Sequence, residues 1–217
     1  MRRGLSSLVV IVGLGLLVGG CFGPVVRPTA DFTWCPDGTY GMLDYRFISQ
    51  STTVPNHYNT LLYWEFSDGT TAEGHPWKDV IHRFAEEGTY QVTLVVTDDR
   101  GVSGTVTKEV SVIEAAVIRS WNLTLGWPVE VTGEVMNRHT EPLHTVTVKA
   151  KFYNADGVRL TEGSVEISKM EPGERARFTV TAQEYSSEIF YATVFVESFD
   201  IDCSGAPFYP ERDAANR

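Results

Sequence analysis

The sequence predicts an all-β protein built from two immunoglobulin-like β-sandwich domains in tandem. Apolar and polar residues alternate with period two in many short runs, as in half-buried strands. Turn residues separate these runs at the short intervals typical of sandwiches. No stretch keeps a period of 3.6 residues for long enough to predict a helix. The length of 217 residues leaves room for two small domains, each with its own core.

The same patterns divide the chain into segments. An N-terminal signal segment covers residues 1–20, and a short tether with glycine and prolines covers residues 21–29. The first sandwich is predicted over residues 30–113 and the second over residues 114–203. The polar tail, residues 204–217, is predicted to be loosely ordered.

The N-terminal segment has the layout of a secretory signal. Arg2 and Arg3 precede an apolar run over residues 8–18, which is short for a transmembrane helix. Residues 17–21 read Leu-Val-Gly-Gly-Cys, and the whole resembles a bacterial lipoprotein signal peptide. The resemblance implies that Cys21 is acylated, that cleavage occurs before it, and that its lipid holds the protein at a membrane. The alternatives are an uncleaved anchor and an ordinary secretory signal with an incidental cysteine.

The net charge limits the classes of partner, and the cysteine content indicates the compartment. The chain has 18 Lys+Arg and 28 Asp+Glu, a net charge of −10, which argues against nucleic acid and anionic membrane surfaces as partners. If Cys21 is acylated, Cys35 and Cys203 remain as a pair in an oxidising compartment. They form either a disulfide or two free buried thiols, because the sequence gives no distance between them.

The first domain contains strands with one apolar face. Every second residue is apolar in residues 62–66 and again in residues 90–96, and Trp64 lies mid-strand at a predicted core position. Asp68 and Gly69 form a turn in which the carboxylate can accept backbone hydrogen bonds and the glycine can take positive φ.

Three motifs of this domain resemble the PKD domain, a family of extracellular β-sandwiches. They are Tyr-Trp-Glu-Phe-Ser-Asp-Gly at 63–69, His-Arg-Phe at 82–84 and Gly-Thr-Tyr-Gln-Val-Thr-Leu-Val-Val-Thr-Asp at 88–98. The chain departs from the family at Ser67, where glycine is usual, and in the longer segment 51–60. Tyr90 resembles a tyrosine corner. His82 is expected to be packed or hydrogen-bonded.

The second domain is also predicted to be β. Residues 114–128 link the halves and are expected to open the domain with a strand, and residues 146–152 alternate clearly between apolar and polar. Three motifs resemble the FxLYD domain, a small β-sandwich of prokaryotic envelope proteins: Gly-Glu-Val-Met-Asn at 133–137, Phe-Tyr-Asn-Ala-Asp-Gly at 152–157 and Met-Glu-Pro-Gly-Glu at 170–174. This resemblance implies a fold and says almost nothing about activity.

No catalytic pattern is recognisable. Gly-x-Ser-x-Gly, His-Glu-x-x-His, Walker and Cys-x-x-Cys motifs are absent, and the five histidines are not spaced as metal ligands. We therefore predict no catalytic residue, cofactor or metal, and expect that the chain is not an enzyme. A calcium site at Asp68, Asp98 and Asp99 is an alternative to turn capping, which we favour because no run of alternating oxygen ligands is present.

Aromatic residues in loops are the best indication of binding. Tyr58, His75 and Trp77 fall in or beside loops of the first domain and could stack on sugars or anchor a protein, although packing within the domain is the simpler interpretation. We expect a non-catalytic protein, lipid-anchored outside the cytoplasm at the cell membrane or outer membrane, that binds an envelope protein or glycan. A structural spacer or assembly subunit, and a small hydrolase with an unrecognised site, are the alternatives.

Overall fold

The computed structural model describes residues 25–76 and 79–203, and every regular element within these ranges is a strand. The strands are β1 (Phe32–Pro36), β2 (Asp44–Ser49), β3 (Asn59–Phe66), β4 (Thr71–Gly74), β5 (Val80–Arg83), β6 (Gly88–Asp98), β7 (Ser103–Val112), β8 (Ala116–Thr124), β9 (Glu130–Asn137), β10 (Leu143–Tyr153), β11 (Arg159–Met170), β12 (Arg175–Thr181) and β13 (Tyr191–Ile201). The predicted signal segment and tail lie outside the described residues.

The first sandwich packs a three-stranded sheet, β1-β2-β5, against a four-stranded sheet, β4-β3-β6-β7. All strand pairs are antiparallel. Trp64 on β3 is 1% exposed, and its ring centroid lies 5.1 Å from that of Phe32 and 5.7 Å from that of Phe47. The core of this domain is therefore centred on aromatic rings, with Trp64 at the predicted core position.

Two local features of the first domain follow the sequence pattern. The Asp68 carboxylate accepts a hydrogen bond from the Thr70 amide at 3.0 Å, and Gly69 has φ of 88°, a conformation that disfavours residues with a Cβ. The Tyr90 hydroxyl donates to the carbonyl of Glu86 at 3.0 Å, which is the bond of a tyrosine corner. Both contacts fix the ends of strands.

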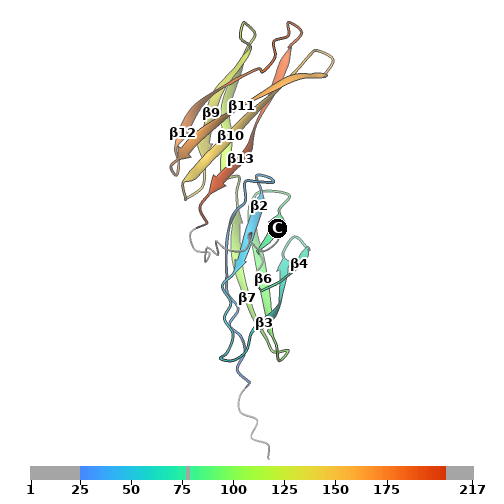
Figure 1. Cartoon of the computed structure of the whole chain (residues 1–217), viewed down its shortest axis with the longest axis vertical. Coiled ribbons are helices and arrows are strands. Elements are labelled where there is room, and N and C mark those ends of the chain that lie inside the picture. The colour runs from blue at the N-terminus through green and yellow to red at the C-terminus, as the bar shows by residue number, and fades with distance from the viewer. Residues whose placement is uncertain (1–24, 77–78, 204–217) are drawn as a thin grey trace, which may run out of the picture.

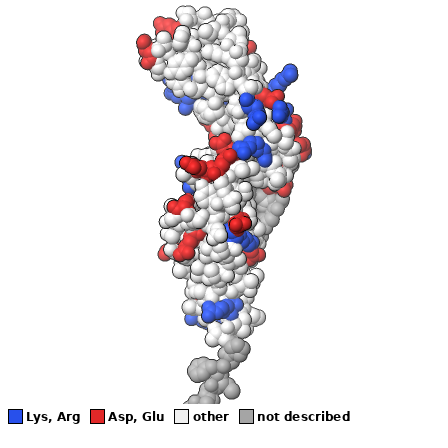
Figure 2. Space-filling view, turned by 180° about the vertical axis from the view of Figure 1, so that it is seen from behind, with Lys and Arg blue, Asp and Glu red and all other residues white. Residues whose placement is uncertain are grey.

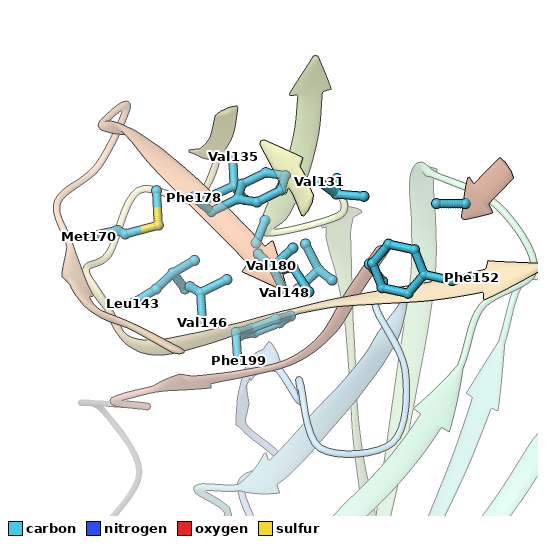
Figure 3. Packing of buried hydrophobic residues seen from close by; sticks show 14 of the residues in the cluster. Val131, Val135, Leu143, Val146, Val148, Phe152, Met170, Phe178, Val180 and Phe199 are labelled. Atoms are coloured by element: carbon cyan, nitrogen blue, oxygen red, sulfur yellow. The ribbon is translucent and has the colours of Figure 1, made fainter. Parts of the chain in front are cut away.

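The second sandwich contains the sheets β12-β9-β8 and β11-β10-β13. Its core is largely aliphatic (Figure 3), with Val131, Val146 and Val148 fully buried from facing strands and Phe178 and Phe199 packed among them. The alternation predicted for β10 holds, because Val146, Val148, Ala150 and Phe152 are all buried. Two sandwiches in tandem are thereby confirmed.

The sandwiches stack end to end in an elongated molecule (Figures 1 and 2), and the junction between them is bonded on several sides. The Tyr45 hydroxyl donates to the Ile113 carbonyl at 3.1 Å and accepts from the Ile113 amide at 2.9 Å. Glu87 of the first domain forms an ion pair with Arg138 of the second at 2.6 Å. The short connection between β7 and β8 is thus held by side chains of the first domain.

A disulfide crosses the same junction. Cys35 at the end of β1 is joined to Cys203, just beyond β13, with Cα atoms 5.8 Å apart and 168 residues between them in sequence. Of the two states that the cysteine count allows, the structure contains the bonded one. Beside it, a Cβ on Gly38 would overlap the backbone oxygen of Phe199, so the close approach of the domains requires glycine there.

The start of the described chain also belongs to the first domain. Arg100 donates to the Val26 carbonyl at 2.8 Å, Arg27 donates to the Ser103 carbonyl at 2.8 Å, and Thr29 pairs with Thr52 as an isolated bridge. Residues 26–29, the second half of the predicted tether, are therefore held against the sandwich by these contacts.

Candidate binding surface

The connections of the second sandwich alternate between its two ends. Antiparallel pairing places Thr124 opposite Glu130 and Tyr153 opposite both Arg159 and Tyr191. Three loops therefore meet at the end that points away from the first domain (Figure 1). We call this surface the apex and define it as residues 125–129, 153–158 and 182–191.

The apex exposes most of its large apolar side chains. Trp127 is 79% exposed, Phe190 66% and Tyr185 53%. Leu125, Val158 and Tyr191 are also exposed. Scattered apolar residues on a surface are ordinary, but several large exposed ones on three neighbouring loops are typical of a surface that contacts a partner.

Four of the five aromatic rings of the apex form two pairs. The rings of Trp127 and Tyr185 meet edge to face, with centroids 4.7 Å apart and planes at 75°. Tyr153 and Tyr191, which are opposite each other in the β10–β13 register, stack with centroids 5.0 Å apart and planes at 8°. These contacts join the three loops, since each pair takes its rings from two different segments.

Backbone hydrogen bonds hold these loops in place. Ala182 donates to the Val129 carbonyl at 3.0 Å, and Phe190 donates to the Tyr153 carbonyl at 2.8 Å. Within the second loop, the Asn154 side-chain oxygen accepts from the amides of Asp156 at 3.0 Å and Val158 at 2.9 Å. The exposed rings therefore stand on a fixed base, which lowers the entropy cost of binding.

The charges of the apex are of one sign. Asp156, Glu184 and Glu188 are exposed, and these three segments contain no Lys or Arg. Arg159, the first residue of β11, forms an ion pair with Glu162 at 3.1 Å. Figure 2 shows Asp and Glu on otherwise uncharged surface at this end of the molecule. The apex thus combines an aromatic centre with carboxylates.

The binding residues predicted from the sequence lie elsewhere. Tyr58 is 61% exposed in the loop before β3, and its carbonyl accepts a hydrogen bond from the Asp99 amide at 3.0 Å. His75 follows β4 and is exposed. Because Gly74 pairs with Leu62, Tyr58 and His75 lie toward the same end of the four-stranded sheet, the end remote from the apex. Trp77 and Cys21 lie outside the described residues.

The three carboxylates considered for calcium have separate partners. Asp68 contacts His82 at 2.7 Å, Asp99 contacts His57 at 2.9 Å, and Asp98 contacts Arg100 at 2.6 Å.

Asp98 is buried and caps its turn. Burial raises its pKa, but hydrogen bonds from the Arg100 side chain and from the Val102 and Arg100 amides outweigh that effect and hold the pKa below its usual value. Across residues 25–76 and 79–203, no group of three or more His, Cys, Asp or Glu is arranged to hold a metal ion.

A pocket of about 410 Å³ opens beside the disulfide at the junction. Trp34 and Lys108 line it from the first domain, and His139 and Glu141 line it from the second. The Lys108 amine is already bonded to the Phe32 carbonyl at 2.6 Å, and burial lowers the pKa of His139. With its cation engaged in this way, the pocket is a weaker candidate than the apex.

Sequence reasoning missed the apex, although two signals pointed to it. Residues 182–190 lack period-two alternation, which predicts a loop around Tyr185. Pro128 cannot donate to a strand ladder, which predicts a loop at Trp127. In an antiparallel sandwich every second connection returns to the same end, and this rule brings the three loops together.

Within the described part of the chain, no helix is long and apolar enough to cross a membrane.

Residues 25–112 match the family model of the PKD domain, and the first sandwich is a PKD domain. A microbial collagenase of Vibrio alginolyticus is 37% identical over 65 residues, which are 30% of this chain and 8% of that protein. The chain thus spans about 8% of the length of this curated relative.

Solved structures with similarity include two further PKD domains. The PKD1 domain from the Vibrio cholerae metalloprotease PrtV is 26% identical and covers 40% of this chain and 98% of its own, with a TM-score of 0.35. The PKD1 domain of Vibrio anguillarum Epp is 25% identical, with coverages of 40% and 94% and a TM-score of 0.35. A structure of carbohydrate-binding modules from the β-sandwich superfamily is 15% identical, covers 81% of this chain and 98% of its own, and has a TM-score of 0.36.

Proposed function

We propose that this chain is a lipid-anchored protein of the cell envelope that displays the apex for binding a protein or glycan and catalyses no reaction itself. The observation that carries the proposal is the set of exposed aromatic side chains on three loops at one end of the molecule. Aromatic residues of this kind supply much of the binding energy where partners meet.

The position of the first described residues supports display. The first described residues lie at the end of the first domain opposite the apex (Figure 1), and only residues 22–24 separate Val25 from Cys21 in sequence. A lipid on Cys21 would place the membrane beside the PKD domain and turn the apex away from it. Residues 26–29 are bonded to that domain, so little slack is available between membrane and sandwich.

The anchor is tested by labelling. The full chain is produced in a bacterium with the lipoprotein pathway and supplied with radioactive palmitate. Wild-type protein should carry the label and sediment with membranes, whereas Cys21→Ser should lose the label and be released or accumulate unprocessed. Label that persists in Cys21→Ser would refute acylation at this residue.

Display is tested by photo-cross-linking in intact cells. The photoreactive residue p-benzoylphenylalanine is placed in the full chain instead of Phe190 at the apex, and in matched controls instead of the exposed aromatics Tyr58 and Tyr40. We expect cross-links from the Phe190 position to exceed those from both controls. Equal yields from all three would contradict display by the apex, and a higher yield from the Tyr58 position would restore the site predicted from sequence.

A structural spacer is the second candidate function, and the bonded junction favours it. The disulfide, the Glu87–Arg138 ion pair and the contacts of Tyr45 hold the two sandwiches in line. A spacer requires this stiffness but does not require the apex rings. If replacing Trp127 and Tyr185 by alanine changes no cross-link and no envelope property, the spacer is the better interpretation.

A further inference from the structure

The chemistry of the apex indicates one class of partner. We infer that the apex binds a protein surface rich in Lys and Arg, an inference that rests on the proposed role in display. Its three segments contain Trp127, three Tyr, Ser186 and Ser187 beside the carboxylates of Asp156, Glu184 and Glu188. Loops rich in Tyr, Ser and Trp at one end of an immunoglobulin-like sandwich are the composition and position of an antibody combining site.

The anchor of this interface is Trp127. Its ring is the most exposed of the apex, and Tyr185 meets it edge to face, which leaves an indole face open to a ligand. Tryptophan has the strongest attraction of any side chain for a cation above its ring, and arginine is the usual donor of that cation. Glu184 directly precedes Tyr185, the ring partner of Trp127, so the loop that contacts the indole also carries a carboxylate for a guanidinium.

The charge of the apex selects among partners. Asp156, Glu184 and Glu188 form no ion pair with any described Lys or Arg, so their charge is available to a partner. Anionic membranes, nucleic acids and a second copy of this acidic chain would each bring like charge to the surface. A neutral glycan could stack on the rings but would cover the carboxylates without a countercharge. A basic protein surface uses both features.

The experiment measures how the cross-link depends on charge. The full chain carrying p-benzoylphenylalanine instead of Phe190 is irradiated in isolated envelopes at increasing NaCl concentration, and the cross-linked species are identified by mass spectrometry. The variant Asp156→Asn/Glu184→Gln/Glu188→Gln removes the apex charge. The control Glu65→Gln/Glu73→Gln/Glu109→Gln removes the same charge from exposed positions of the first domain.

We expect the cross-linked peptides to come from one protein segment with an excess of Lys and Arg. The yield should fall about tenfold in the apex variant and at high salt, and change less than about twofold in the control. Trp127→Ala should reduce it about thirtyfold, whereas Trp121→Ala, which removes an exposed tryptophan from β8, should not.

Three results would overturn the inference. A basic partner is excluded if the cross-links go to glycan or lipid, or to a protein segment without basic residues. It is also excluded if the yield changes neither with salt nor with the apex charge. If Trp127→Ala abolishes cross-links that the charge variant leaves intact, display stands and only the partner class is wrong. If neither variant changes the cross-links, both proposals fail.

Discussion

The two sandwiches differ in how far aromatic rings make up their cores. The PKD domain buries its large rings in the core, namely Phe32, Tyr45, Phe47, Trp64, Phe66 and Phe84. The second domain fills its core mainly with aliphatic residues beside Phe152, Phe178 and Phe199, and presents Trp127, Tyr185 and Phe190 to solvent. Aromatic rings therefore dominate the core of one domain, whereas in the other several of them lie on an exposed end. The difference follows from position, because strand residues alternate inward and loop residues at a sandwich end do not.

The strongest test of this contrast compares two tryptophans. Trp64→Ala should reduce the free energy of unfolding of the first domain by about 3–5 kcal/mol, because it leaves a cavity among buried rings. Trp127→Ala should change the stability of the second domain by less than about 0.5 kcal/mol, because its ring is mostly in water. Urea unfolding followed by NMR resonances assigned to each domain measures both effects. A large loss of stability from Trp127→Ala would show that the apex rings serve folding.

Removing the disulfide tests whether the two domains act as one body. Cys35→Ser/Cys203→Ser should cost about 2–4 kcal/mol of stability, since the bond closes a long loop in the unfolded chain. We expect the two unfolding transitions to separate further, and small-angle scattering to report a wider range of domain orientations. An unchanged scattering profile would assign the alignment to the Glu87–Arg138 pair and the Tyr45 contacts alone.

Acid should affect the first domain more than the second. The carboxyl groups with pKa values held below their usual range are Asp31, Asp37, Asp68, Glu87 and Asp98 in the first domain and Glu162 in the second. A lowered pKa in the folded state stabilises the fold above the unfolded value of about 4, and this contribution is lost as pH falls through the folded pKa.

The measurement is the urea midpoint of each domain at pH 6 and pH 3. The midpoint of the first domain should fall by more. An equal fall in both domains would contradict the uneven distribution of these carboxyl groups.

The smallest effect concerns tyrosine hydroxyls. Tyr90→Phe removes the bond to the Glu86 carbonyl and should cost about 1 kcal/mol, whereas Tyr185→Phe, at an exposed position, should cost almost nothing. Thermal unfolding of the two variants beside wild type makes the comparison. Equal losses would mean that the Tyr185 hydroxyl has a structural partner.

Strand positions could be predicted from the sequence because they depend on local rules. Period-two alternation placed Trp64 and the buried face of β10 correctly, and turn chemistry placed Gly69 and the capping role of Asp68. The family motifs of the first domain added Tyr90. These features need only neighbours in sequence and the knowledge that one face of each strand is buried.

The apex could not be found in the same way, because it depends on which loops meet in space. Trp127 lies in a segment that reads as a link between domains, and Tyr185 lies in a loop without a motif. Tyr58 and His75 stand out in the sequence as aromatic residues in loops, but the sequence does not show to which end of the molecule a loop belongs. The Cys35–Cys203 bond could not be predicted for the same reason, since the sequence gives no distance between cysteines 168 residues apart.

The junction disulfide also makes most of the chain a covalent ring. Any single cut by a protease between Cys35 and Cys203, including a cut in one of the apex loops, opens the ring without releasing a fragment. The pieces stay attached to each other and, through residues 25–35, to whatever holds the N-terminus. A nicked molecule would therefore keep its apex attached to the first domain until a reductant also reached the junction.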